Sequence, residues 1–229
     1  MAKTISLITT GLQGTLGDIT YVKSKRYGKH ARTKRGTYKP ATLNKKMKES
    51  SSRLSFANAP AKLIFDALRH DHKDGSLWSR LLSIYRKQVK DGVAPDIQCL
   101  AKLECNHDFK LDVLLSDYKL QTVVDNNMLQ VDVQLNHIPV WTKVKYLSGY
   151  QVSITALFVD MEKLQLEKVV MHGPVSSMKG DLEPLHFKIP VPAMAKEYLL
   201  LMKVEGAENG KLVGLEHVKG MRVVVTAKI

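Results

Sequence analysis

Strict alternation of apolar and polar residues governs the second half of this chain. It runs unbroken through Leu129-Gln130-Val131-Asp132-Val133-Gln134-Leu135. Successive side chains of a β-strand point to opposite faces of the sheet, so this period of two predicts strands that each bury one face. Apolar residues at every second position recur in three further stretches, residues 150–158, 198–204 and 221–227.

Turn-forming residues separate these stretches. Asp125-Asn126-Asn127 and Ser148-Gly149 are of this kind, and Asn209-Gly210 is a strong hairpin sequence. The apolar positions of residues 109–113 are expected to begin the series, and residues 172–184 are expected to form a longer loop. Roughly seven or eight strands, each with one apolar face, predict an antiparallel β-sandwich, with an up-and-down barrel as the alternative.

A helical period of 3.6 residues replaces this alternation upstream, in residues 41–95. Leu43, Met47 and Leu54 share one face of the first expected helix. Thr42 precedes that face and is the residue type that caps the N-terminus of a helix. The spacing therefore predicts a helix that begins soon after Thr42.

Two more helices are expected within the same segment. Proline lacks the N–H that a helix interior needs, so Pro60 is expected to interrupt the first helix, with Asn58 or Ala59 capping a new one. Ser76 is expected to cap a third helix, which Asp91-Gly92 ends. The apolar stripe of this third helix consists of Leu77, Trp78, Leu81, Leu82, Tyr85 and Val89.

These patterns predict an α+β chain in three parts: a basic arm or β-hairpin over residues 1–40, a short helical segment over 41–95 and an antiparallel β-sandwich over 96–229. With 229 residues, 44% of them hydrophobic, the chain can bury a sizeable core without disulfides or metal. Its two cysteines favour a reducing compartment. No stretch approaches the roughly 20 apolar residues of a membrane span.

The positive charge of the chain is concentrated near its N-terminus. Residues 1–50 contain 12 Lys and Arg against 2 Asp and Glu, whereas residues 93–229 contain 15 against 16. Eleven positive and no negative side chains fall within residues 19–48. This asymmetry indicates an anionic polymer or surface as the partner.

We expect the basic stretch to be an ordered β-hairpin rather than a free tail. Residues 19–24 have the β-branched and aromatic character of a strand, Tyr27-Gly28 supplies a turn, and residues 30–34 return. Lys and Arg on phosphates release counterions, and Tyr can stack on unpaired bases. We therefore predict non-specific binding of DNA or RNA through Lys23, Lys25, Arg26, Lys29, Arg32, Lys34, Arg35, Lys39, Lys45, Lys46, Lys48, Tyr21 and Tyr27.

The sequence contains no Gly-x-Ser-x-Gly, His-Glu-x-x-His or P-loop motif, so we expect neither an enzyme nor a cofactor. His70-Asp71-His72 with Asp74 is the best metal candidate, but nearly consecutive ligands give poor geometry, which favours a solvated loop. Cys99 and Cys105, with His107, are spaced more widely than the usual zinc pair. We expect two buried thiols and a surface histidine there.

Part of the N-terminal sequence resembles a known family. The run Gly17-Asp18-Ile19-Thr20-Tyr21, then Arg26-Tyr27-Gly28-Lys29 and Arg32, followed by Asn58-Ala59 and Leu77-Trp78, resembles the N-terminal part of an uncharacterised protein family of Bacteroidota. The resemblance covers residues 1–90. It implies a helical middle, a β-rich C-terminal part and a bacterial or phage-related setting, and it implies no activity.

Two hypotheses for function follow. The first is a structural protein, cytoplasmic or virion-associated, whose basic arm binds nucleic acid within a homo-oligomer or larger virion-like assembly, without a membrane partner. A basic arm ahead of a β-sandwich is the plan of many virion shell proteins, which is an analogy of architecture. In the second, the arm docks into a neighbouring subunit by adding a strand, without nucleic acid. A hydrolase whose site forms only in three dimensions is a third and weaker alternative.

Overall fold

The structure is a computed structural model that describes residues 14–24, 28–33, 44–71, 74–141, 144 and 146–229. The chain divides into two compact units, residues 1–45 and 46–229, and each is described by itself. Every described strand pair is antiparallel, and three α-helices accompany the strands. The predicted α+β class is therefore confirmed.

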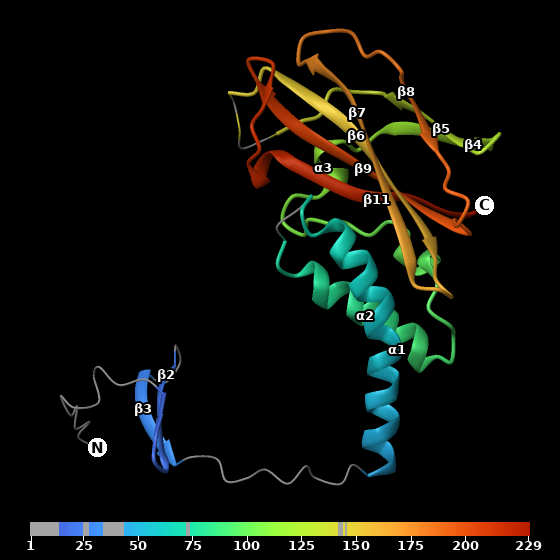
Figure 1. Cartoon of the computed structure of the whole chain (residues 1–229). Coiled ribbons are helices and arrows are strands. Elements are labelled where there is room, and N and C mark those ends of the chain that lie inside the picture. The colour runs from blue at the N-terminus through green and yellow to red at the C-terminus, as the bar shows by residue number, and fades with distance from the viewer. Residues whose placement is uncertain (1–13, 25–27, 34–43, 72–73, 142–143, 145) are drawn as a thin grey trace. The chain divides into compact units, whose positions relative to one another are not determined.

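The first unit contains a small antiparallel sheet. It consists of β1 (Gly14–Leu16), β2 (Ile19–Ser24) and β3 (Gly28–Thr33) in the order β1-β2-β3 (Figure 1). Gly17 lies in the turn between β1 and β2 at a φ of 59°, which glycine adopts without steric cost. The expected hairpin of β2 and β3 is present, and a third short strand extends it. The predicted turn residue Tyr27 lies outside the described residues.

The second unit begins with helices and continues as strands. The helices are α1 (Lys45–Leu68), α2 (Leu77–Lys90) and α3 (Leu111–Leu114), with short 3₁₀ turns at Ile97–Leu100 and Glu216–Val218. The strands are β4 (Tyr118–Asp125), β5 (Met128–Leu135), β6 (Gly149–Asp160), β7 (Gln165–Ser177), β8 (Leu185–Pro190), β9 (Glu197–Glu208), β10 (Lys211–Leu212) and β11 (Lys219–Lys228).

These strands form two sheets. In the larger sheet, β6 pairs with β7 and with β9, and β9 pairs on its other side with both β10 and β11. The smaller sheet has the order β4-β5-β8. The alternation of apolar and polar residues determines which face of this sheet is buried. Leu129, Val131 and Val133 of β5 are buried, while the intervening residues are exposed. The expected apolar face of this strand is confirmed.

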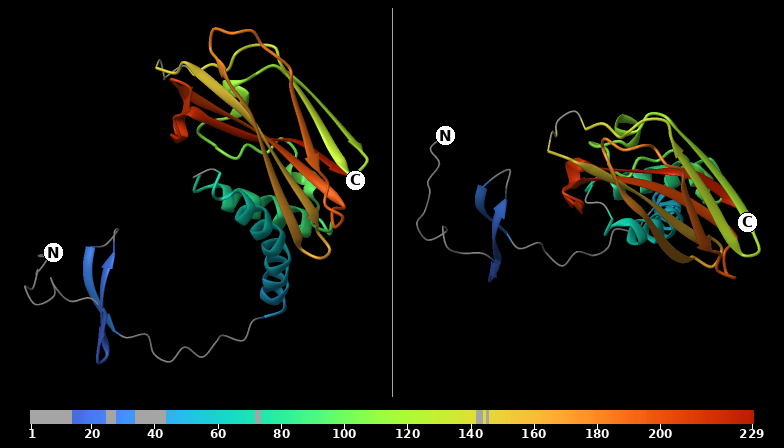
Figure 2. Two further views of the ribbon diagram at one scale, coloured as in Figure 1. Left: turned by 45° about the horizontal axis from the view of Figure 1, so that its top comes forward. Right: turned by 90° about the horizontal axis from the view of Figure 1, so that it is seen from above.

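The larger sheet lies between the smaller sheet and the helices (Figures 1 and 2). On one face, Ile154 and Phe158 of β6 share a hydrophobic core with the smaller sheet. On the other face, Leu157 of β6 and Leu199 of β9 share a second core with α1 and α2. The period of two predicted one apolar face for each strand, whereas β6 and β9 are apolar on both faces where the helices cover them.

Helix α1 is continuous through Pro60, so the expected break at this residue is wrong. Proline inside a helix removes one backbone hydrogen bond and costs about 3 kcal/mol. Pro60 is nevertheless buried, as are Ala57 and Ala61 beside it. Burial of this face of α1 in the helix core offsets the lost bond, and α1 changes direction along its length (Figure 1). Thr42, the expected cap, lies outside the described residues.

Helix α2 matches the predicted third helix. Leu77, Leu81 and Tyr85 are buried, and the helix ends at Asp91 as expected. Ser76 occupies the N-cap position but makes no side-chain capping bond. The expected role of its hydroxyl is therefore wrong.

Two expectations in the β region are also wrong. Residues 111–114 form helix α3 rather than a strand. Strand β7 continues to Ser177, so residues 172–177 are strand rather than loop. The Asn209-Gly210 hairpin is confirmed, since both residues have positive φ, at 49° and 76°.

None of the described helices combines the length and the apolar character that a membrane crossing requires.

The close pairing of β6 with β7 makes a first prediction. A Cβ atom at Gly149 would lie 2.6 Å from the backbone carbonyl oxygen of Ser176. We expect Gly149→Ala to lower the free energy of unfolding by about 1–3 kcal/mol, because backbone atoms on both sides must shift. Urea denaturation measures the change. Gly75→Ala is the control, since an added Cβ there has nothing within 4 Å. Equal effects of the two substitutions would contradict the register of β6 and β7.

Candidate nucleic-acid interface

The hairpin of β2 and β3 places basic side chains on both of its faces. Lys23 lies directly opposite Lys29, and Arg32 lies opposite Thr20 on the other face. Lys23, Lys29 and Arg32 are all exposed, and Tyr21 is half-buried on the face of the two lysines. Like charges directly opposite each other on a sheet repel, which an anion bound between them would relieve.

The sheet of β1, β2 and β3 has no hydrophobic core among its described side chains. Leu16 and Ile19 are 70% and 44% exposed, and none of the side chains described in this unit is buried. Small sheets need an apolar face packed against something to be stable on their own. The described side chains of this sheet therefore supply no buried apolar face of their own.

The cations at the start of α1 are also exposed to solvent. Lys45, Lys46 and Lys48 are exposed, as is every residue up to Phe56 in the first turns of this helix. The predicted residues that the structure describes are thus Tyr21, Lys23, Lys29, Arg32, Lys45, Lys46 and Lys48. The other predicted residues, Lys25, Arg26, Tyr27, Lys34, Arg35 and Lys39, lie outside the described residues.

A second basic site, which was not predicted from the sequence, lies between α1 and α2. Arg53 of α1 faces Arg86, Lys87 and Lys90 of α2 across a groove of about 520 Å³. The signal was present in the sequence as basic residues on the polar side of α2. Sequence alone did not show that α1 would continue through Pro60 and bring Arg53 to the same side.

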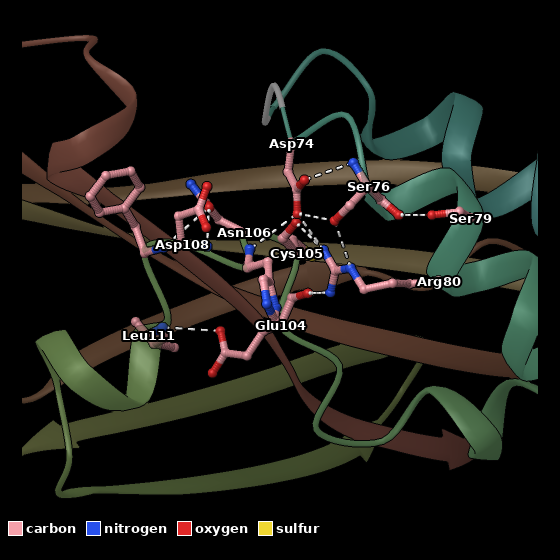
Figure 3. Close-up of polar contacts among 11 residues, drawn as sticks. Asp74, Ser76, Ser79, Arg80, Glu104, Cys105, Asn106, Asp108 and Leu111 are labelled. Carbon is pink, nitrogen blue, oxygen red and sulfur yellow. Dashed lines mark hydrogen bonds and ion pairs between the residues drawn. The ribbon is translucent and has the colours of Figure 1, made fainter.

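Another cation of α2, Arg80, is used inside the unit rather than at its surface (Figure 3). Its guanidinium donates to the backbone carbonyl oxygens of Glu104 and Cys105, at 2.5 and 3.0 Å. It also pairs with the Asp74 carboxylate at 2.5 Å. Arg80 therefore ties the N-terminus of α2 to the segment that leads into the β region.

Asp74 collects hydrogen bonds from both sides of this junction. It accepts from the backbone amide and the hydroxyl of Ser76, at 2.8 and 3.0 Å, and from the backbone amide of His107 at 3.0 Å. Burial by itself would raise the pKa of Asp74. The hydrogen bonds from Ser76 and His107 and the charge of Arg80 outweigh burial and lower the pKa to about 2.

The residues considered for metal binding serve as links between elements. Asp71 pairs with Lys168 of β7 at 2.5 Å, and Lys168 also donates to the carbonyl oxygen of Ala67 at 2.9 Å. His70 accepts a hydrogen bond from Arg69, and His72 lies outside the described residues. Within the described ranges, no group of three His, Cys, Asp or Glu side chains is placed to hold a metal ion. The two described aspartates are thus engaged in ion pairs rather than solvated.

The two cysteines are free thiols in separate surroundings. Cys105 is fully buried, and Cys99 is half-buried and donates to the carbonyl oxygen of Asp96 at 2.9 Å. Burial, with a smaller contribution from Asp96, raises the pKa of Cys99 to about 12. Burial also raises the pKa of Cys105. A raised pKa disfavours the thiolate, the form that nucleophilic and redox chemistry requires, in both cysteines.

Glu104 has a structural role at the same junction. One of its carboxylate oxygens accepts from the backbone amide of Leu111, at 3.0 Å, at the start of α3. Burial raises the pKa of Glu104, although the Leu111 amide and the nearby Arg222 act in the opposite direction. Asn106 beside it is buried and accepts from the amides of Asp108 and Phe109. These contacts shape the turn that precedes α3.

Comparison with known proteins identifies no relative. No family model matches the chain, and neither the curated proteins nor the solved structures include a significant match.

The lowered pKa of Asp74 makes a second prediction. Its ionised form is favoured by folding, so this contribution is present above pH 4 and is lost as the pH falls towards 2. The difference from the usual pKa of 3.8 corresponds to about 2 kcal/mol. We expect Asp74→Asn to lower the free energy of unfolding by about this amount at pH 7 and to flatten its decline between pH 5 and 2.

Urea denaturation across this pH range measures both effects. Asp66→Asn, which removes an exposed carboxylate of α1, is the control and should keep the wild-type pH dependence. An unchanged acid decline in Asp74→Asn would contradict the role assigned to this carboxylate.

Proposed function

We propose that this chain is a non-enzymatic structural protein that binds nucleic acid through its basic N-terminal arm. The observation that carries the proposal is the β2–β3 hairpin, which displays Lys23, Lys29 and Arg32 outside any core. Phosphates placed on these cations would release condensed counterions and give strong, salt-sensitive binding without sequence preference. DNA and RNA are both suitable partners on this chemistry.

The remainder of the chain would act as the body of a repeated assembly. In this proposal the two sheets of the second unit form a β-sandwich that contacts neighbouring copies, in a homo-oligomer or a virion-like shell. The protein would then be cytoplasmic or virion-associated. A bacterial or phage-related setting, as in the Bacteroidota family that the N-terminal sequence resembles, fits this role.

A second candidate is assembly without nucleic acid. The observation that favours it is the order β1-β2-β3 of the arm's sheet, in which β1 and β3 are the outer described strands and are placed to add a strand of another copy. Light scattering of nucleic-acid-free protein separates the two. Large oligomers that require residues 1–40 would favour this second candidate.

Charge reversal in the hairpin tests the first candidate. We expect Lys29→Glu to weaken the binding of DNA and RNA and to reduce the slope of log affinity against log salt by about one. The new glutamate would face Lys23 directly, and opposite charges at that position stabilise a hairpin. Weaker binding therefore cannot be attributed to loss of the hairpin.

Fluorescence anisotropy with labelled strands at several salt concentrations measures the effect. Lys188→Glu makes the same charge change at an exposed position of β8 and is the control. The proposal fails if Lys29→Glu and Arg32→Glu bind no more weakly than Lys188→Glu. It also fails if a chain beginning at residue 50 binds as well as the full chain.

A further inference from the structure

The groove between α1 and α2 combines positive charge, hydroxyl groups and an aromatic ring. Its cations are Arg53, Arg86, Lys87 and Lys90, and none of the described residues that line it is acidic. Serine hydroxyls line both sides, one from Ser50 of α1 and two from Ser79 and Ser83 of α2. Trp78 contributes the ring.

Stability of the helix accounts for only part of this charge. Lys87 and Lys90 lie in the last turn of α2, where cations complement the helix dipole. Arg86 and Lys90, however, are four residues apart, a spacing at which like charges repel. Arg53 adds a further cation from a different helix. A bound anion would offset the repulsion among the four cations around this groove.

Trp78 is placed to supply a flat apolar surface beside these cations. It is half-buried, and Phe65 of α1 holds it edge-to-face, with ring centroids 5.5 Å apart and an interplanar angle of 68°. A ring fixed in this way loses little freedom when another ring packs on it. Aromatic rings flanked by basic side chains are the recurring surface for unpaired bases of single strands.

The size of the groove limits the ligand. A volume of about 520 Å³ lies within the roughly 300–1,000 Å³ typical of small-molecule sites. This space suits one or two nucleotides rather than the full width of a duplex. Hydroxyl and guanidinium groups are common donors to phosphate oxygens, so the lining also suits the backbone of such a strand.

We propose that this groove binds one or two nucleotides of a single strand, with phosphates on Arg53, Arg86 and Lys90 and a base against Trp78. This site deepens the proposed nucleic-acid function and rests on it, but it uses none of the arm residues. It adds a preference for unpaired strands, which cations alone would not give.

Tryptophan fluorescence tests the site directly. The chain contains two tryptophans, and the other, Trp141, is 8% exposed within the β core. In the full-length Trp141→Phe variant, titration with a tetrathymidylate should quench the remaining fluorescence of Trp78 in a saturable manner. The Trp78→Phe variant should show no quenching.

Anisotropy of a labelled decathymidylate gives a second measurement, which does not depend on the stability of Trp141→Phe. We expect Trp78→Ala and Arg53→Glu each to weaken binding by about tenfold, in line with the contributions measured for stacking and phosphate contacts. Lys62→Glu is the matched control, since it changes the same charge at an exposed position of α1 outside the groove. Its affinity should stay within twofold of wild type.

Several outcomes would overturn the site. These are unquenched Trp78 at saturating tetrathymidylate, an effect of Arg53→Glu no larger than that of Lys62→Glu, and equal affinity for single-stranded and duplex decamers. Unchanged decathymidylate affinity in Trp78→Ala would also refute the stacking of a base. The two proposals fail separately: if Lys29→Glu binds normally while Arg53→Glu does not, the arm is excluded and the groove stands. The converse result excludes the groove and leaves the arm.

Discussion

Burial of β6 and β9 on both faces is the constraint on which the second unit depends. A strand covered on both faces must be apolar on both, because unpaired polar groups lose water there. Residues 156–159 of β6 and 198–202 of β9 meet this requirement, and they lie where the helices cover the sheet. Farther along the same face, Ser153 and Glu205 are polar although buried, and Glu205 pairs with Lys203. The apolar run of this face therefore coincides with the part that packs against α1 and α2.

Polar contacts then decide how the helices are oriented on this sheet. Arg80 and Asp74 join the start of α2 to the segment before α3, and Lys168 joins β7 to the end of α1. These contacts hold cations inside the unit, where they cannot meet a partner. The basic residues of the helical segment therefore fall into two groups. One group makes contacts within the unit, and the other faces solvent. Only the contacts of the individual side chains show to which group a residue belongs.

Sequence patterns predicted the elements whose periodicity was long and regular. The alternation of residues 129–135 was sufficient to predict β5, and the apolar stripe of residues 77–89 was sufficient to predict α2. The Asn209-Gly210 sequence was sufficient to predict its turn. The prediction that the helix breaks at Pro60 was wrong because burial of this face of α1 outweighs the local preference of proline against the interior of a helix. The arm cations could be identified from charge density alone, whereas the groove needed two helices brought together.

The two basic regions differ in what supports them. The α2 side of the groove stands on a helix whose opposite face is buried in a core, and Trp78 packs against that core, whereas Ser50 and Arg53 belong to the exposed first turns of α1. The arm's sheet buries none of its described side chains, so ordering it gains little from hydrophobic contact and must overcome the entropy of the chain. In the proposed function, a nucleic acid that neutralises its charge would supply the missing free energy. Binding at the arm would then be coupled to ordering of the sheet and sensitive to salt, while the proposed binding in the groove would depend more on stacking of the base.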